Sequence, residues 1–119
     1  VYKRQYKYFS QSARMDLDDI HNNFYAGIHA ANMAGTWQGI VFGFAGVRSN
    51  AGYLQINPKL PGQWKSYEFR LQYKGSGLNI KVTDKKVEYT LLNDCELSYE
   101  SLGEKIVLSK EGDKYVQEI

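Results

Sequence analysis

The spacing of apolar residues changes once along this chain of 119 residues, near residue 48, and this change constrains the fold most strongly. Before residue 48, apolar side chains recur every three or four residues, which is the period of an amphipathic helix. After "GVRSNAG" they alternate with polar ones, which is the period of a half-buried strand. The sequence therefore predicts an α+β chain in which helices come first and strands follow.

The first helix is predicted to begin near the start of the chain and to end within "DLDD", residues 16–19, or shortly after it. Acidic residues at a helix C-terminus oppose the macrodipole, so another interaction should stabilise them there. "HNN" then indicates a loop. The apolar stripe of this helix consists of Tyr2, Tyr6, Phe9, Ala13 and Ile20, with Leu17 close by.

The second helix is predicted over residues 27–44, where small residues recur at intervals of four. Each glycine would cost an isolated helix about 1 kcal/mol relative to alanine, so this helix depends on tertiary packing. We expect a smooth stripe along which another backbone can approach closely, and a helix buried on most sides. The stripe comprises Gly27, Ala31, Gly35, Gly39 and Gly43.

A membrane span is the alternative interpretation of this second helix, because residues 27–47 carry no formal charge. Glycines at this spacing also resemble a transmembrane dimer motif. However, four polar residues lower the hydrophobicity, and no aromatic or basic belt flanks both ends. A buried helix of a soluble protein is favoured. The polar residues are His29, Asn32, Thr36 and Gln38.

The second part of the chain contains short alternating segments separated by turn residues. Strands are predicted at "YLQIN", "WKSYEFRLQYK", "LNIKV" and "VEYTL", and around residues 97–99, 104–108 and 115–116. Turns are predicted at "KLPGQ", "GSG" and "TDKK", and "SKEGDK" predicts a hairpin between the last two strands. Six or more short strands with this turn spacing predict an antiparallel β-sandwich or jelly roll.

Composition excludes several classes of function. The net charge is +2 and there is no run of five like charges, which argues against nucleic acid and against a membrane surface. Cys95 is the single cysteine, so an intrachain disulfide is impossible, and no Cys/His spacing suits a metal. We expect a reducing, cytoplasmic location. The chain starts without a signal-peptide pattern or an initiator methionine, which we interpret as a piece of a longer protein.

Motifs for catalysis are scarce. The sequence has no P-loop, no G-x-S-x-G elbow and no H-E-x-x-H. Asp16, Asp18 and Asp19 could form a cation site, but they lack the glycine and distal glutamate of an EF-hand loop. Helix capping and solvation are the commoner roles, and Asp19 is the first candidate for a structural one.

Aromatic residues in the strand region raise the possibility of sugar stacking. We expect five of them to be exposed, although aromatic residues at alternating strand positions more commonly belong to the core. A carbohydrate-binding module therefore stays open beside the core interpretation. The five residues are Trp64, Tyr73, Tyr89, Tyr99 and Tyr115.

His29 is the remaining candidate for chemistry. A lone histidine on an apolar helix is commonly a core residue, but His29 falls in the predicted first turn, just after Gly27. A helix N-terminus presents free N–H groups and a partial positive charge, which suit an anion. The residues alone therefore leave two interpretations open, a core histidine and an anion ligand.

Several segments together resemble a known family. "DLDD", "GIHAANMAGTW", "GFAGVR", "PKLPGQW" and "FRLQYKG" occur in this order between residue 13 and about residue 82. They resemble the C-terminal part of the glycoside hydrolase family 65 phosphorylases, which act on maltose, trehalose, kojibiose or nigerose. The resemblance implies that residues 1–47 are the last helix pair of an (α/α)6 catalytic barrel. Residues 48–119 would form the C-terminal jelly-roll domain.

The resemblance also implies a reaction. Such enzymes cleave an α-glucosidic disaccharide with inorganic phosphate, invert the anomeric centre and release β-glucose 1-phosphate. His29 matches the phosphate-binding histidine of the family, and backbone near Gly27 would help to hold the anion. "GIHAA" favours phosphorolysis, because hydrolytic relatives such as acid trehalases differ in this segment.

The remaining expectations concern what this piece contains. The glutamate acid lies on an earlier part of the barrel, so no catalytic residue is assigned here and the isolated chain should be inactive. No cofactor is implied, since inorganic phosphate is a co-substrate. Expected partners of the parent enzyme are the disaccharide, phosphate, the rest of the barrel and a second copy in a homodimer. The alternative function is a non-catalytic β-sandwich that binds carbohydrate or a protein partner.

Overall fold

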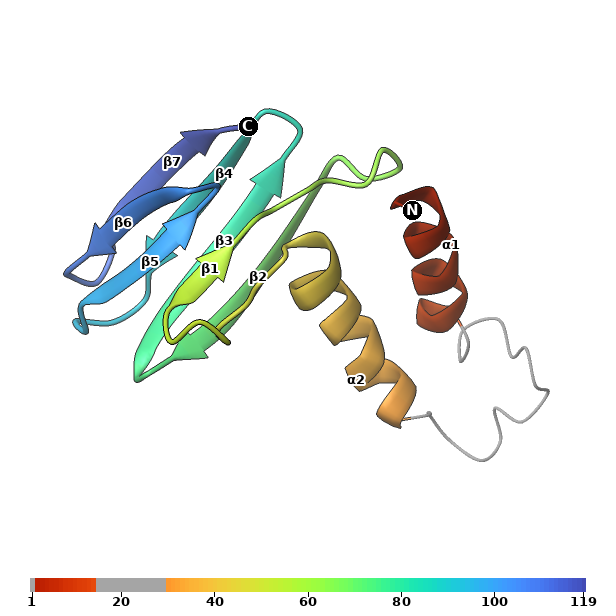
Figure 1. The fold of residues 1–119 in the computed structure, drawn as a ribbon, viewed down its shortest axis with the longest axis horizontal. Helices are drawn as coiled ribbons and strands as arrows, with labels where there is room; N and C mark the ends of the chain where they lie inside the picture. The colour runs from red at the N-terminus through yellow and green to blue at the C-terminus, as the bar shows by residue number, and fades with distance from the viewer. Residues whose placement is uncertain (1, 15–29) are drawn as a thin grey trace. The chain divides into compact units, whose positions relative to one another are not determined.

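The computed structural model describes residues 2–14 and 30–119 (Figure 1). The described residues divide between two compact units, Val1–Gly43 and Phe44–Ile119. The helices are α1 (Tyr2–Ala13), α2 (Ala30–Gln38) and the π-helix η2 (Gly39–Phe44). The strands are β1 (Leu54–Ile56), β2 (Ser66–Tyr73), β3 (Ser76–Thr83), β4 (Lys86–Leu91), β5 (Leu97–Ser101), β6 (Glu104–Leu108) and β7 (Lys114–Glu118). The predicted fold class, a helix pair followed by a two-sheet β-structure, is confirmed.

Helix α1 is amphipathic, as predicted, but shorter than predicted. Tyr6 and Phe9 are half-buried and their rings lie 6.5 Å apart, whereas Arg4 and Lys7 are exposed. The helix ends at Ala13, before "DLDD", so the predicted end was wrong. A helix continued to that point would have placed three carboxylates at its negative end, which the macrodipole disfavours.

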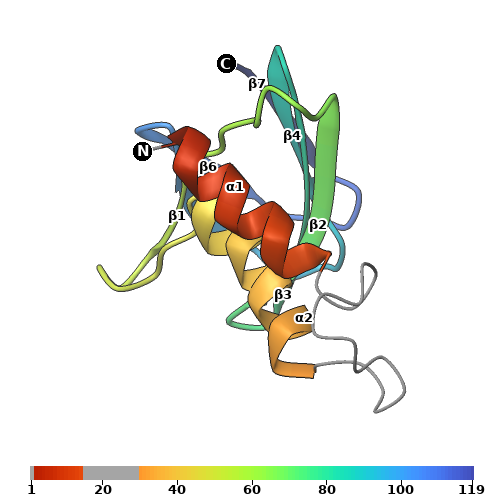
Figure 2. The same ribbon diagram turned by 90° about the vertical axis from the view of Figure 1, so that its right-hand side faces the viewer.

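The glycine stripe of the second helix meets side chains of α1 at two positions, rather than making the close backbone approach that the spacing predicted. A Cβ added at Gly39 would lie 2.8 Å from Cδ2 of Phe9, and one added at Gly43 would lie 2.6 Å from Nε2 of Gln5. The two helices lie side by side in both views (Figures 1 and 2). A side chain at position 39 would therefore require the Phe9 ring to move.

The second helix differs from its prediction in two respects. Its last residues, η2, form a π-helix, which apolar spacing cannot reveal because the segment is too short to show a period of its own. Its expected burial on most sides is also wrong, because Trp37 is 47% exposed and Phe42 is 44% exposed. Their rings meet edge to face at 6.2 Å and form an uncovered apolar surface.

The β-unit consists of two sheets, with strand orders β1-β5-β6 and β2-β3-β4-β7. In Figure 2, β1 and β6 lie on one side of this unit and β2, β4 and β7 on the other. Among the described strands, all pairs are antiparallel except β1–β5, which is parallel, so the predicted antiparallel sandwich is confirmed with one parallel pair that the sequence did not indicate. After β1 the chain forms β2, β3 and β4 of the other sheet before it returns to the first sheet as β5. This long connection allows β5 to run in the same direction as β1.

Two tight turns close hairpins in this unit. Lys74 and Gly75 have φ values of 50° and 84°, and Leu102 and Gly103 have 51° and 84°. Positive φ at both central residues is the signature of a type I′ turn, whose twist matches paired strands. The turn predicted at "GSG" therefore lies one residue earlier than expected, because Ser76 and Gly77 already belong to β3.

The predicted hairpin at "SKEGDK" was wrong. The turn itself forms, because the Asp113 carboxylate accepts hydrogen bonds from the backbone N–H groups of Lys110 and Ser109, at 2.9 and 3.0 Å. These bonds also lower the pKa of Asp113. However, β7 pairs with β4 of the other sheet rather than with β6. Local turn chemistry reverses the chain but does not choose the strand with which it pairs.

The core lies between the two sheets and follows the predicted alternation. Every inward position of β3 and β4 predicted from the sequence is fully buried, while Lys81 and Lys86 stay exposed. Sheet-to-sheet contact is direct, since the rings of Tyr89 on β4 and Tyr99 on β5 meet at 4.9 Å. The buried inward residues of β3 and β4 are Leu78, Ile80, Val82, Val87, Tyr89 and Leu91.

Candidate functional site

The residues predicted from the sequence to bind phosphate, His29 and Gly27, lie outside the described residues. The same holds for Asp16, Asp18 and Asp19. Helix α2 begins at Ala30, directly after His29 in the sequence. The phosphate site and the acidic cluster therefore stay predictions.

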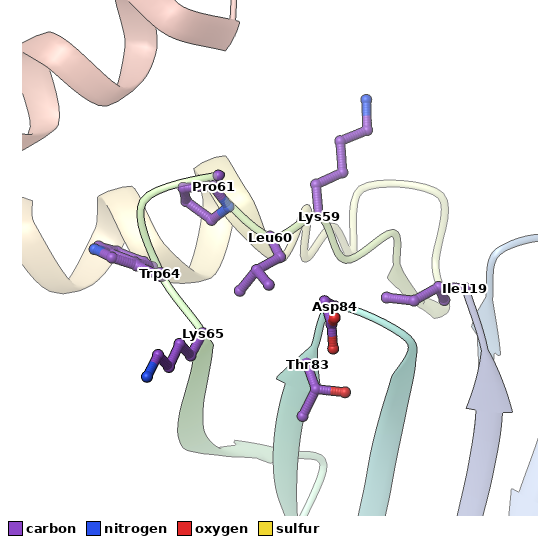
Figure 3. Close-up of a pocket in the computed structure, with 9 residues that line it drawn as sticks. Lys59, Leu60, Pro61, Trp64, Lys65, Thr83, Asp84 and Ile119 are labelled. Carbon is purple, nitrogen blue, oxygen red and sulfur yellow. The ribbon is translucent and has the colours of Figure 1, made fainter.

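A hollow of about 770 Å³ lies beside the "KLPGQW" loop (Figure 3). Three separate segments form it: the loop before β2, the turn between β3 and β4, and the end of β7. Its volume falls within the range of ligand pockets, roughly 300–1,000 Å³. Its lining comprises Lys59, Leu60, Pro61, Gly62, Trp64, Lys65, Thr83, Asp84 and Ile119.

The loop that borders this hollow is held rigidly. The Tyr67 hydroxyl donates a hydrogen bond to the Lys59 carbonyl at 2.9 Å. The backbone N–H of Trp64 donates a hydrogen bond to the Pro61 carbonyl at 3.0 Å. Trp64 also packs edge to face against Phe44, with ring centroids 5.3 Å apart, and against Tyr67 at 6.0 Å. The predicted turn at "KLPGQ" is thus confirmed as a loop fastened by an aromatic cluster.

The polar groups around the hollow do not converge on one point. In Figure 3 the Lys59 side chain points away from the hollow, while Leu60 and Ile119 point toward its middle from opposite sides. Trp64 and Lys65 extend to one side of the loop. A site for a small polar ligand needs a few polar groups aimed at the same atoms. This hollow is therefore a surface depression with an apolar floor rather than a catalytic centre.

The sequence did not predict this hollow as a unit. "KLPGQW" gave the loop, but Thr83, Asp84 and Ile119 come from segments far along the chain. Nothing in their local sequence marks them, because the β3–β4 turn and the end of β7 meet only through sheet pairing, as Lys86 pairs with Glu118.

Two of the five aromatic residues considered for sugar stacking are core residues. Tyr89 is fully buried and Tyr99 is 2% exposed, so neither can stack on a sugar. Burial raises the pKa of Tyr89 to about 12, and burial also raises the pKa of Tyr99. Trp64 and Tyr73 are half-buried. The core interpretation is thus confirmed for Tyr89 and Tyr99.

Tyr115 links the two sheets at the surface. Its hydroxyl donates to Oε2 of Glu104 at 3.0 Å, and this bond raises the pKa of Tyr115. The ring is half-buried rather than free on the surface. Its observed role is therefore to fasten β7 to β6.

No metal centre is found in the part of the chain that the structure describes, where no three His, Cys, Asp or Glu side chains gather. Within the same residues, no helix is long and apolar enough to cross a membrane. Cys95 carries a free thiol.

Comparison with known proteins gives a consistent result. The family model for the C-terminal domain of glycosyl hydrolase family 65 matches residues 47–108. An α,α-trehalose phosphorylase from Geobacillus stearothermophilus is 44% identical over 91% of this chain. A maltose phosphorylase from Bacillus subtilis (strain 168) is 33% identical over 89% of it. The chain spans 14% of the length of each of these relatives.

A solved structure gives the same result in three dimensions. The "Putative kojibiose phosphorylase from human microbiome" superposes with a TM-score of 0.84 at 30% sequence identity. The match covers 95% of this chain and 16% of the solved one. It includes both the helices and the strands, because 95% of the chain leaves no room to omit either.

Proposed function

The chain belongs to glycosyl hydrolase family 65, and from this premise we propose that it is the C-terminal part of an inverting disaccharide phosphorylase. The observation that carries the proposal is the similarity over most of the chain to phosphorylases of trehalose and maltose. The full-length protein would cleave an α-glucosidic disaccharide with inorganic phosphate and release β-glucose 1-phosphate. Residues 1–47 would end the catalytic barrel and residues 48–119 would form the C-terminal domain.

In this reaction, phosphate attacks the anomeric carbon from the face opposite the leaving sugar. A carboxylic acid on an earlier part of the polypeptide protonates the glycosidic oxygen. Phosphate is already anionic, so it needs no carboxylate base, unlike the water used by an inverting hydrolase. What this chain would contribute is a phosphate-binding group and not the acid.

His29 is the residue to which we assign this contribution. An imidazole N–H can donate a hydrogen bond to a phosphate oxygen. Backbone N–H groups at the start of a helix favour an anion, and the sequence predicts that His29 lies in the first turn of the second helix. Gly27 would leave the backbone near the anion free of a side chain. Together these groups would hold phosphate for in-line attack.

The helix pair would complete the barrel by packing against the preceding polypeptide. Trp37 and Phe42 leave a large part of their surface uncovered, although apolar surface of this kind is normally buried. The relatives are about seven times longer than the matched segment, since it amounts to 14% of their length. The rest of the barrel is therefore the partner that would cover these side chains.

We also propose that the parent protein is a homodimer and that it is located in the cytoplasm. A homodimer would appear as twice the monomer mass in light scattering of the full-length protein. A cytoplasmic location rests on the single cysteine of this chain and would be tested by fractionation of cells that express the parent.

The test of the proposed function uses the full-length parent. It is incubated separately with trehalose, maltose and kojibiose, each with and without inorganic phosphate, and the products are followed by NMR. We expect β-glucose 1-phosphate from one of the disaccharides and only when phosphate is present. Release of free glucose at the same rate without phosphate would make the parent a hydrolase. The isolated chain of 119 residues should give no turnover.

A further inference from the structure

The outer face of the three-stranded sheet carries an ordered set of side chains that the fold does not require. Because side chains alternate along a strand, residues next to buried ones point outward. Strand pairing sets Gln55 beside Glu100 and Glu100 beside Lys105. The bridge between Arg48 and Gln55 extends this row by one residue. The result is one continuous row of an amide, a carboxylate and two cations.

An exposed aromatic ring adjoins this polar row. Tyr53 directly precedes β1 and is 45% exposed. Its hydroxyl accepts a hydrogen bond from Nε2 of Gln55 at 3.1 Å, which limits rotation of the ring. Tyr53 and Gln55 are two residues apart, and this bond places them on the same face. The tyrosine is thus held in position beside polar groups rather than free to swing into solvent.

A hollow of about 320 Å³ lies on this face, next to Gln55 in the strand register. Its lining comprises Tyr53, Ser98, Tyr99, Glu100 and Lys105. This volume lies at the lower end of the range of ligand pockets, roughly 300–1,000 Å³, so the hollow suits one small ligand.

The charged groups at the hollow are open to a ligand. Glu100 and Lys105 are register partners across β5 and β6, yet within the described residues they form no ion pair with each other. Glu100 offers acceptors to sugar hydroxyls, and Lys105 and Ser98 offer donors. An aromatic face suits the apolar face of a sugar ring, because Tyr combines a large apolar surface with a polar tip.

We propose that this face, defined by Tyr53, Gln55, Ser98, Glu100 and Lys105, binds a hexose unit of a neutral oligosaccharide. The sugar would lie against the Tyr53 ring, with its hydroxyls bonded to Glu100, Lys105 and Ser98. Binding needs neither phosphate nor a general acid, so it goes beyond the proposed phosphorolysis. It also moves the sugar-stacking role from Trp64 and Tyr73 to a tyrosine that the sequence did not single out.

The test is an NMR titration of the isotope-labelled chain with maltotriose as the probe. We expect shifts of the amide signals of Tyr53, Ser98, Glu100 and Lys105 and a dissociation constant of about 1 mM, typical of a small open site. Tyr53→Ala should weaken binding at least tenfold. The matched control is Tyr8→Ala, since Tyr8 is an exposed tyrosine of α1, and it should bind as the unmodified chain does.

Tyr53→Phe and Glu100→Gln complete the test, because they keep most of the packing if Tyr53→Ala does not fold. Tyr53→Phe should retain binding within about threefold, whereas Glu100→Gln should weaken it severalfold. Equal binding by the unmodified chain and Tyr53→Ala would overturn the proposal, as would shifts confined to other residues. Competition by inorganic phosphate would show an anion site instead. The readout involves no turnover, so failure here leaves the proposed phosphorolysis untouched.

Discussion

Tyr89 on β4 and Ser101 on β5 belong to different sheets, and their hydroxyl oxygens lie 2.5 Å apart in the buried core. The Ser101 hydroxyl donates to Oε1 of Gln117 at 2.6 Å, which can only accept. Tyr89 must therefore donate to Ser101. Gln117 returns a bond from Nε2 to the Ser101 carbonyl at 3.2 Å. This chain of bonds joins β4, β5 and β7 and satisfies all three buried side chains.

The first prediction compares two core tyrosines. Tyr89→Phe should lower the free energy of unfolding by about 1–2 kcal/mol, because Ser101 loses its buried donor. Tyr99→Phe should be neutral or stabilising, because the Tyr99 hydroxyl has no hydrogen-bond partner within the described residues. Urea unfolding of the two variants measures both effects. An equal loss in both would mean that the network adds nothing to stability.

The second prediction concerns alkaline pH. The pKa of Tyr89 rises from its ordinary 10.0 to about 12 in the folded protein. Below pH 10 the tyrosine is protonated in both states, so its full contribution to stability is present. Between pH 10 and 12 only the unfolded chain releases the proton, so the free energy of unfolding should fall as pH rises. Denaturant titrations across this range would measure the slope, and Tyr89→Phe should make it shallower.

The third prediction tests the packing of the helix pair. Gly39→Ala should destabilise it, because the new Cβ would lie 2.8 Å from the Phe9 ring. Gly35→Ala is the matched control, since nothing lies within 4 Å of its Cβ position. That control should gain up to ~1 kcal/mol from helix propensity alone. Far-UV circular dichroism during thermal unfolding would report both changes.

A double variant checks the cause of the Gly39 effect. Phe9→Ala removes the ring that a methyl group at Gly39 would meet. If the clash is responsible, Gly39→Ala should cost much less in the Phe9→Ala background than in the unmodified chain. Additive losses would point instead to the π-helical backbone of η2.

The fourth prediction concerns phosphate binding in the full-length parent. His29→Ala should raise the KM for phosphate by roughly 10- to 100-fold, since a hydrogen bond to a charged group is worth about 1.5–3 kcal/mol. The KM for the disaccharide should change little. Initial rates at varied phosphate and varied sugar would separate the two constants. An unchanged phosphate KM would make His29 a packing residue.

The fifth prediction concerns the loop beside the larger hollow. Tyr67→Phe should lower the free energy of unfolding by about 1 kcal/mol, because the Lys59 carbonyl loses its donor while the ring stays. Hydrogen exchange at the Trp64 amide should also become faster, since that amide closes the same loop. Unchanged exchange would show that the aromatic contacts with Phe44 hold the loop without this bond.

The spacing of apolar residues predicted the helices and strands, because an element that is buried on one face carries apolar residues at regular intervals. Tyr67 and Phe69 are buried while Glu68 and Arg70 are exposed, as alternation requires. The same logic could not fix the end of α1, since Leu17 and Ile20 continue the stripe beyond Ala13. The predicted phosphate site at His29 came from motif resemblance, and the described residues do not include it. The Tyr53 face escaped prediction because its members lie on strands distant in sequence.

By itself, the sequence determined the helix-to-strand order, the inward faces of β2, β3 and β4, and the family, because these depend on side chains close together along the chain. Tertiary structure alone decided that β1 runs parallel to β5 and that β7 leaves β6 to pair with β4. It also decided that Tyr99 is buried in the core, whereas Tyr53 stays half exposed. Strand pairing depends on which sheet edges and which buried polar groups meet in the folded protein. These contacts join residues far apart along the chain, so they leave no periodic signal in the sequence.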